Sequence, residues 1–232
     1  EGVGRRADLV KAVADAANFP VVLPTGVYRE PWIPVWAQSA AEDDLYSWMK
    51  NELEREIKGT GVRAGFIKLS AGDDNLTPTE KKILNAAVRA ARSTSAAIAS
   101  HTIRGRVVRE QLEIIEAGGY SAERFIWVHA HNEPDFTLHL EMAQRGAWIE
   151  YDNIGWQADD ERYLVLIQQM LAAGYEDRVL LSQDMGWFDP AKPGGGIPKP
   201  FIYLAEQFIP KMRIANISEK TIYQMTAINP FR

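Results

Sequence analysis

The sequence predicts an α/β protein built on a parallel sheet, and three observations carry this prediction. Short, nearly continuous apolar runs recur along the 232 residues. Amphipathic segments with helical spacing lie between these runs, and polar turn residues separate the two kinds of segment. A strand followed by a helix, repeated along the chain, is typical of a parallel sheet whose faces are covered by helices.

Six apolar runs are predicted to be strands, because each is short and lacks alternation of polar and apolar residues. That pattern is typical of strands that are buried on both faces. Beyond residue 64, the centres of the runs are spaced by roughly one strand–helix unit, about 30 residues or slightly less. The six runs are Pro20–Leu23, Ala64–Leu69, Ala96–Ser100, Phe125–His129, Ala147–Glu150 and Val179–Ser182.

The segments between these runs are predicted to be helices. Arg6–Asn18 and Ala41–Ile57 each place apolar residues on one stripe, as a helix that packs on a core does. Thr77 followed by Pro78 is typical of a helix start, with proline in the first turn. Further helices are expected at Pro134–Gln144, Asp159–Ala172 and Lys199–Phe208.

Six strands leave two architectures open. One is an open six-stranded sheet, and the other is a (β/α)8 barrel that lacks its first two strands in this chain, since the chain opens on a helix. A barrel of this kind typically has about 250 residues, so a length of 232 residues does not decide between them. In both cases we expect a single domain over residues 1–232.

Composition excludes several kinds of function. The 26 Lys and Arg residues against 31 Asp and Glu residues give a net charge of -5, which argues against nucleic acid as a partner. The chain has no apolar run of the about 20 residues that a membrane helix needs and opens without a secretory leader. We therefore expect a cytoplasmic protein without a membrane partner. Because the chain has no cysteine, any metal must be held by nitrogen and oxygen ligands.

Four predicted strands end in a polar side chain that could bind metal or accept a proton. These side chains are Lys68, His101, His129 and Asp184. Each one alone also has a structural explanation, such as a snorkelling lysine, a hydrogen-bonded core histidine or an aspartate that caps a turn. Active sites of parallel α/β folds lie at the carboxyl ends of the strands. The four together therefore indicate a metal-dependent hydrolase.

Lys68 and Asp184 carry the most specific expectations. Lys68 lies inside an apolar run, where burial disfavours the charged ammonium form. A neutral amine in such a site can add carbon dioxide, and the resulting carbamate can bridge two divalent metals. Asp184 precedes an aromatic, glycine-rich loop at residues 185–200, and a carboxylate there can bind metal and take a proton from bound water.

The remaining histidines and one further aspartate are given lesser roles. His129 is favoured over His131 as a ligand because it directly ends its strand, and His131 is expected to point into the loop. His139 lies in a helical pattern and is expected to be structural. Asp152 follows another strand and is expected to contact substrate.

Seven segments resemble phosphotriesterase-related proteins, a family of the amidohydrolase superfamily that includes bacterial phosphotriesterases and phosphotriesterase-like lactonases. Their order and spacing match this family across nearly all of the chain. The segments are PTGVYRE, GFIKLS, IASHT, FIWVHAHNEPD, GAWIEYDNIG, LLSQDMGWFDPAKPGGG and NPFR.

The resemblance implies a (β/α)8 TIM-type barrel with two divalent metal ions, zinc being the first choice. Lys68 matches the carboxylated lysine that bridges the metals, and His101 and His129 match the ligands of the more exposed metal. Asp184 matches the last-strand aspartate, which binds the buried metal and accepts a proton. Tyr28 is similar to a tyrosine beside the metals of lactonase-type members, and Trp187 to the loop that shapes the leaving-group pocket.

The chain departs from the family pattern in two places. The His-x-His pair of the family's first strand has no counterpart upstream, so we expect the first two strands to be absent from this chain. Gln183 stands where many family members have a histidine, and His131 is unusual at its position.

The resulting hypothesis is a hydrolase of small-molecule lactones or carboxylic esters, with phosphotriesters as further substrates. The alternative is a catalytically impaired small-molecule binding protein of the same family. Relatives often dimerise, so the resemblance is compatible with a homodimer, but the sequence points to no interface and leaves the oligomeric state open. A nucleotide-binding sheet is disfavoured, since Gly194–Gly196 lacks the lysine spacing of a phosphate loop.

Overall fold

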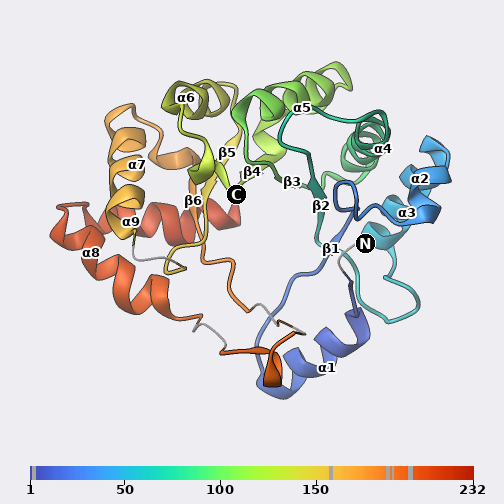
Figure 1. Cartoon of the computed structure of the whole chain (residues 1–232), viewed down its shortest axis with the longest axis horizontal. Helices are drawn as coiled ribbons and strands as arrows, with labels where there is room; N and C mark the ends of the chain where they lie inside the picture. The colour runs from blue at the N-terminus through green and yellow to red at the C-terminus, as the bar shows by residue number, and fades with distance from the viewer. Residues whose placement is uncertain (2–3, 157–158, 187–188, 190, 198–200) are drawn as a thin grey trace. The chain divides into compact units, whose positions relative to one another are not determined.

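The structure is a computed structural model that describes residues 1, 4–156, 159–186, 189, 191–197 and 201–232. Strands and helices alternate along the chain, and the six strands follow one another in the sheet in the order β1-β2-β3-β4-β5-β6 (Figure 1). The chain divides into two compact units, Glu1–Trp127 and Val128–Arg232. Each unit is described by itself.

The first unit holds three parallel strands, the start of a fourth and the helices that cover them. β1 pairs with β2 and β2 with β3, both in parallel, so that Lys68 lies beside Ala99 and Ser70 beside His101. The elements are α1 (Ala7–Ala17), β1 (Pro24–Thr25), α2 (Val35–Ser39), α3 (Glu42–Glu54), β2 (Phe66–Ser70), α4 (Pro78–Thr94), β3 (Ile98–His101), α5 (Gly105–Ala117), the turn η1 (Ala122–Arg124) and β4 (Phe125–Val128), which runs on into the second unit.

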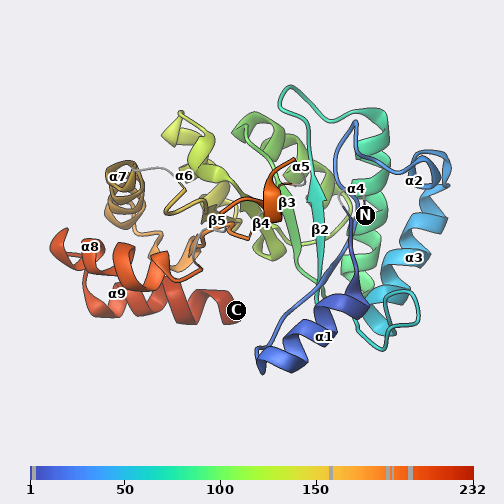
Figure 2. The same ribbon diagram turned by 60° about the horizontal axis from the view of Figure 1, so that its bottom comes forward.

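Helix α4 covers the sheet of the first unit, packing against β2 and β3 with α3 and α5 as its neighbours (Figures 1 and 2). Its start follows from the sequence, because the Thr77 side chain accepts a hydrogen bond from Glu80 N at 3.2 Å and Glu80 accepts one from Thr77 N at 3.0 Å. This reciprocal cap satisfies two backbone groups that the first turn leaves unpaired. Ile67 and Ile98 of the strands and Leu84 of α4 are buried in this core.

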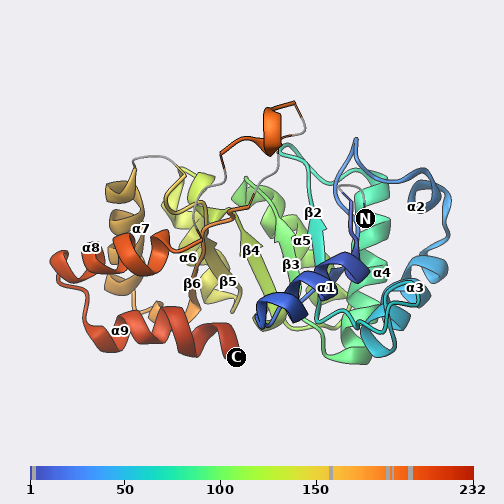
Figure 3. The ribbon, with the colours of Figure 1, turned by 90° about the horizontal axis from the view of Figure 1, so that it is seen from below.

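The second unit continues the pattern with two parallel strands. β5 pairs with β6, with Ile149 beside Val179 and Tyr151 beside Leu181. α8 and α9 contact each other, as Figure 3 shows. The elements are η2 (Ala130–Asn132), α6 (Phe136–Gln144), β5 (Trp148–Tyr151), α7 (Asp160–Ala172), η3 (Glu176–Arg178), β6 (Val179–Leu181), η4 (Pro193–Gly195), η5 (Leu204–Phe208), α8 (Ile209–Ile214), α9 (Glu219–Tyr223), η6 (Gln224–Ile228) and η7 (Asn229–Phe231).

Five of the six predicted strands coincide with observed ones, and the first prediction is wrong. Pro20–Leu23 is not a strand, and β1 begins at Pro24. The reason is that Val21 and Val22 are 49% and 67% exposed, so this apolar run does not enter the core of its unit. Within the described part of Lys199–Phe208, the helical turn begins only at Leu204.

Helix α5 was not predicted at all. Its first residue is glycine and its sequence is rich in charge, yet Val108 and Leu112 are fully buried. None of the helices among the described residues has both the length and the apolar character needed to cross a membrane.

Candidate metal centre

Three side chains of the second unit gather where successive strands end. His129 follows β4, Asp152 follows β5, and Asp184 lies just beyond β6. Their potential ligand atoms all lie within 4.8 Å of one another. Nitrogen and carboxylate oxygen are donors that zinc and similar divalent metals accept, so this donor set fits such an ion.

The backbone around this cluster is unusual. His129, Asn153 and Asp184 have φ angles of 69°, 62° and 46°, in the left-handed region that residues other than glycine rarely adopt. Such conformations cost free energy and gather at functional sites. Each of the three strand ends therefore turns sharply, and the turns place the cluster's side chains together.

Asp152 holds His129 with both of its carboxylate oxygens. Oδ2 accepts a hydrogen bond from His129 N at 2.7 Å, and Oδ1 lies 2.5 Å from His129 Nδ1. Asp152 is 1% exposed, so its charge needs partners of this kind. Because Nδ1 faces Asp152, Nε2 is the ring nitrogen directed elsewhere. A carboxylate behind a histidine in this way fixes the ring and its tautomer in many metal sites.

His131 does not point into a loop, and that expectation is wrong. It is 3% exposed, its Nδ1 lies 3.7 Å from Asp152 Oδ1, and its Nε2 lies 3.1 Å from the amide nitrogen of Asn132. Burial lowers the pKa of His131 to about 4, so the ring is neutral at pH 7. The sequence offered no signal for this, since the short turn η2 after His129 folds the chain back.

Tyr28, Lys68 and His101 are positioned within the first unit. The Tyr28 hydroxyl lies 3.2 Å from His101 Nδ1. Lys68 is half-buried, and its Nζ donates to Leu69 O at 3.3 Å. Tyr28 and Lys68 line one cavity of about 300 Å³ together with Arg5 and Thr25.

Gly26 allows β1 to approach β2 at this cavity. Its φ is +119°, and a Cβ there would lie 2.1 Å from Lys68 O. Only glycine fits such a close approach of two backbones. The backbone of Glu1 brackets the same turn, because Glu1 N donates to Gly26 O at 2.7 Å and Tyr28 N donates to Glu1 O at 2.9 Å. Tyr28 is thereby held at the rim of the cavity.

The structure thus arranges the predicted residues in two groups, one in each unit. Their assembly into one metal centre stays a prediction, and so does the substrate contact of Asp152. Trp187 lies outside the described residues. Asn153, which lies next to both aspartates of the cluster, was missed by the sequence interpretation. The signal that could have found it is the enrichment of asparagine in left-handed turns.

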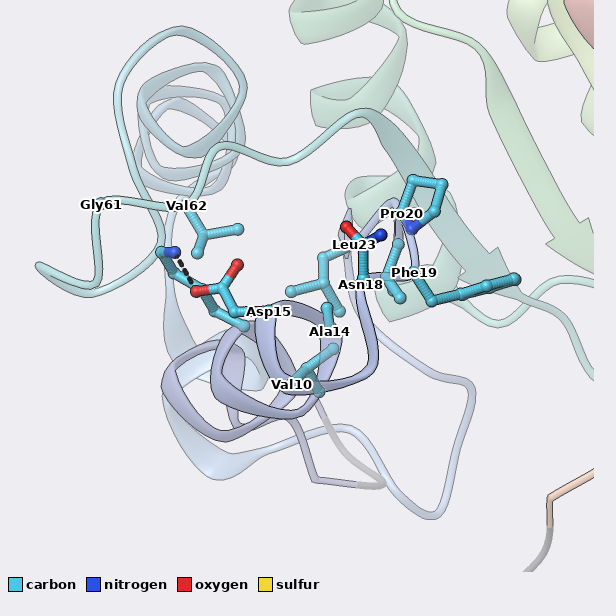
Figure 4. A pocket seen from close by; sticks show the side chains of 11 residues that line it. Val10, Ala14, Asp15, Asn18, Phe19, Pro20, Leu23, Gly61 and Val62 are labelled. Atoms are coloured by element: carbon cyan, nitrogen blue, oxygen red, sulfur yellow. Dashed lines mark hydrogen bonds and ion pairs between the residues drawn. The ribbon is translucent and has the colours of Figure 1, made fainter.

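A larger hollow in the first unit lies between α1 and the chain that leads to β1 (Figure 4). It has a volume of about 570 Å³ and is lined mainly by apolar residues such as Val10, Ala14 and Leu23. Its only carboxylate among the described lining residues is Asp15, which pairs with Lys11 at 2.6 Å. This donor set does not suit a metal, so the hollow is not the candidate centre.

Comparison with known proteins settles the family. The model of the Phosphotriesterase family matches residues 1–232. The chain belongs to the phosphotriesterase family. It is 29% identical over 231 residues to the phosphotriesterase homology protein of Escherichia coli, covering 98% of this chain and 78% of the relative.

Solved structures of the family agree with this assignment. The crystal structure of the Escherichia coli protein with phosphate in its active site matches with a TM-score of 0.90 at 28% identity, over 99% of this chain and 80% of the other. A mutant organophosphorus hydrolase from Deinococcus radiodurans matches with a TM-score of 0.89 at 31% identity, over 99% and 75%. A lactonase from Listeria monocytogenes matches with a TM-score of 0.89 at 25% identity, over 98% and 76%.

These matches confirm the predicted family and fold class. The parallel strands of the described residues, six in number, are consistent with a (β/α)8 barrel of this family that lacks some of its eight strands. The chain is accordingly a member of a family of metal-dependent hydrolases, with a candidate metal-binding group in its second unit.

Proposed function

We propose that this phosphotriesterase-family chain is a hydrolase that uses two divalent metal ions to cleave lactones or carboxylic esters, with phosphotriesters as further substrates. The observation that carries the proposal is the cluster of His129, Asp152 and Asp184 at three successive strand ends, with ligand atoms within 4.8 Å of one another. Left-handed backbone at His129 and Asp184 supports it further.

Four residues are proposed to hold the metals, zinc being the first choice. They are His129 and Asp184 of the second unit and His101 and the carbamate of Lys68 from the first. When bound, a metal of this kind lowers the pKa of water to about 7 and polarises an ester carbonyl or phosphoryl oxygen. The basis for combining the two groups is the position of all four residues at strand ends, together with the family resemblance.

The protein's own groups supply orientation and proton transfer. Asp152 fixes the His129 ring through Nδ1, and Nε2 is the ring nitrogen proposed to bind metal. Asp184 accepts the proton of the attacking water on one carboxylate oxygen. Tyr28, held beside His101 at 3.2 Å, orients the substrate carbonyl through its hydroxyl.

The substrate class is inferred from Tyr28 and from the relatives. The tyrosine supports a lactone or ester, and the similarity to a lactonase points the same way. The similarity to an organophosphorus hydrolase supports phosphotriesters as the second class. A polar cavity of about 130 Å³ adjoins the cluster, with Asn153, Trp156 and Arg162 among its lining residues, and it suits a small polar part of the substrate.

The test compares the parent chain with Lys68→Ala. We expect the variant to lose bound zinc, measured by elemental analysis, and to lose hydrolysis of a panel of lactones, aryl esters and phosphotriesters. Lys81→Ala is the matched control, because Lys81 is an exposed lysine paired with Glu110, and it should retain both. Equal metal and rates in Lys68→Ala would reject the proposed centre. Zinc binding without any turnover by the parent would favour the binding-protein alternative.

A further inference from the structure

Asn153 lies between the two carboxylates of the cluster. It directly follows Asp152 and takes a left-handed φ of 62°. One terminal atom of its side-chain amide lies 3.2 Å from Asp184 Oδ2 and 3.3 Å from Asp152 Oδ1. A single side-chain atom therefore contacts both aspartates.

The chemistry of the neighbours identifies that atom. The oxygen and nitrogen of an amide have the same shape, so their assignment rests on hydrogen bonding. When a carboxylate is ionised, its oxygens act as hydrogen-bond acceptors and cannot donate. The atom facing both aspartates is therefore the nitrogen, and its two hydrogens serve one carboxylate each.

We propose that Asn153 is a positioning residue that joins Asp152 and Asp184 through its amide nitrogen. Asp152 is already committed to His129, with contacts of 2.7 and 2.5 Å to its backbone and ring nitrogens. The bridge extends this clamp to Asp184, so that the ring of His129 and the carboxylate of Asp184 keep a fixed separation. It also places a donor between two negative charges that would otherwise repel each other.

The bridge gives the two carboxylate oxygens of Asp184 different roles. Oδ2 faces the amide of Asn153, and Oδ1 is the oxygen that we assign to metal binding and proton transfer. A neutral amide has no site that accepts a proton at this nitrogen. A proton taken up by Asp184 therefore does not pass on through Asn153.

The first test measures metal binding and rests on the proposed function. Asn153→Gly removes the amide while keeping a residue that tolerates positive φ. Asn216→Gly makes the same change at a φ of 60° in the same unit. We expect Asn153→Gly to bind Co²⁺ about 10-fold more weakly, the size of effect that groups behind metal ligands have, with an altered visible Co²⁺ spectrum. Asn216→Gly should match the parent, and equal affinities and spectra in all three proteins would overturn the inference.

A second test needs no metal, so the two proposals fail separately. In ¹⁵N spectra of the metal-free chain, the side-chain NH₂ signals of Asn153 are those lost in Asn153→Gly. We expect Asp184→Asn to shift both signals, while Asp177→Asn, at a half-exposed residue that pairs with Arg232, leaves them in place. Signals unmoved by Asp184→Asn would overturn the bridge. If the parent takes up no Co²⁺, the proposed function fails and the spectra alone decide the bridge.

Discussion

At the scale of single residues, the cluster shows how one buried carboxylate can serve a neighbour instead of a substrate. Asp152 directly follows β5, and Asp184 lies just beyond β6. In the sequence, the two aspartates therefore look alike. The difference is that both oxygens of Asp152 face His129, while Asp184 is exposed. We infer that Asp152 sets the geometry of His129 and that Asp184 meets the metal and the water.

The substitution Asp152→Asn tests whether Asp152 fixes the His129 ring for metal binding. The amide keeps the size of the side chain but removes the charge that holds the His129 Nδ1–H, so the ring loses its fixed tautomer. We expect metal affinity to fall by about 10- to 100-fold, measured by competition with a chelator. Asp177→Asn serves as the control, and an unchanged affinity in Asp152→Asn would show that the clamp has no part in binding.

At the scale of elements, a buried ion pair ties α3 to the segment before α1. Arg5 contacts Glu52 through both terminal guanidinium nitrogens at 2.7 and 2.9 Å, and the two side chains are only 8% and 2% exposed. Thr25 of β1 also donates to Glu52 at 2.6 Å. These contacts fix β1 against α3, and therefore hold the strand that leads to Tyr28.

Glu52→Gln should destabilise the first unit strongly, because the buried Arg5 guanidinium loses its bidentate partner and keeps the carboxylate of Glu1 at 3.3 Å as a counter-charge. We expect a loss of about 3 kcal/mol in the free energy of unfolding, measured by urea denaturation. Glu54→Gln provides the comparison on the same helix, since its pair with Lys50 is exposed and should be worth less than about 0.5 kcal/mol. Equal effects of the two substitutions would contradict this account.

At the scale of the whole molecule, buried histidines make stability depend on pH. His139 is fully buried and contacts the Tyr151 hydroxyl at 2.9 Å and Glu133 O at 3.1 Å. Burial lowers the pKa of His139 to about 4, below the value of about 6.5 for an unfolded chain. The unfolded state therefore binds the proton more readily, and acid favours unfolding.

The direction of this pKa shift defines the pH range over which stability is lost. The contribution of neutral His139 is complete above pH 6.5 and is lost as the pH falls towards 4, a loss of about 3 kcal/mol. We expect His139→Gln to reduce the slope of unfolding free energy against pH in this range but not to abolish it, because burial also lowers the pKa of His131 to about 4. Urea denaturation at several pH values measures the slope. A slope equal to that of the parent would show that His139 does not carry the dependence.

Patterns within short segments were sufficient for most of the fold. Apolar runs gave five of the six strands, and Thr77 with Pro78 marked the start of α4, because these signals depend on a residue and its close neighbours. The exposed run Val21–Val22 misled the same reasoning, since hydrophobicity alone does not tell whether a segment enters a core. Helix α5 was not predicted, because its many charged residues hid the apolar pattern of the buried Val108 and Leu112.

The sequence by itself determined the α/β class, the family and the presence of metal-binding residue types at strand ends, since order and spacing along the chain are local properties. Only the tertiary structure decided how those residues contact one another. Asp152 behind His129, His131 buried beside them, and Asn153 between two carboxylates all depend on left-handed turns at separate strand ends. Contacts between residues more than twenty positions apart arise from that geometry, and no short pattern in the chain encodes them.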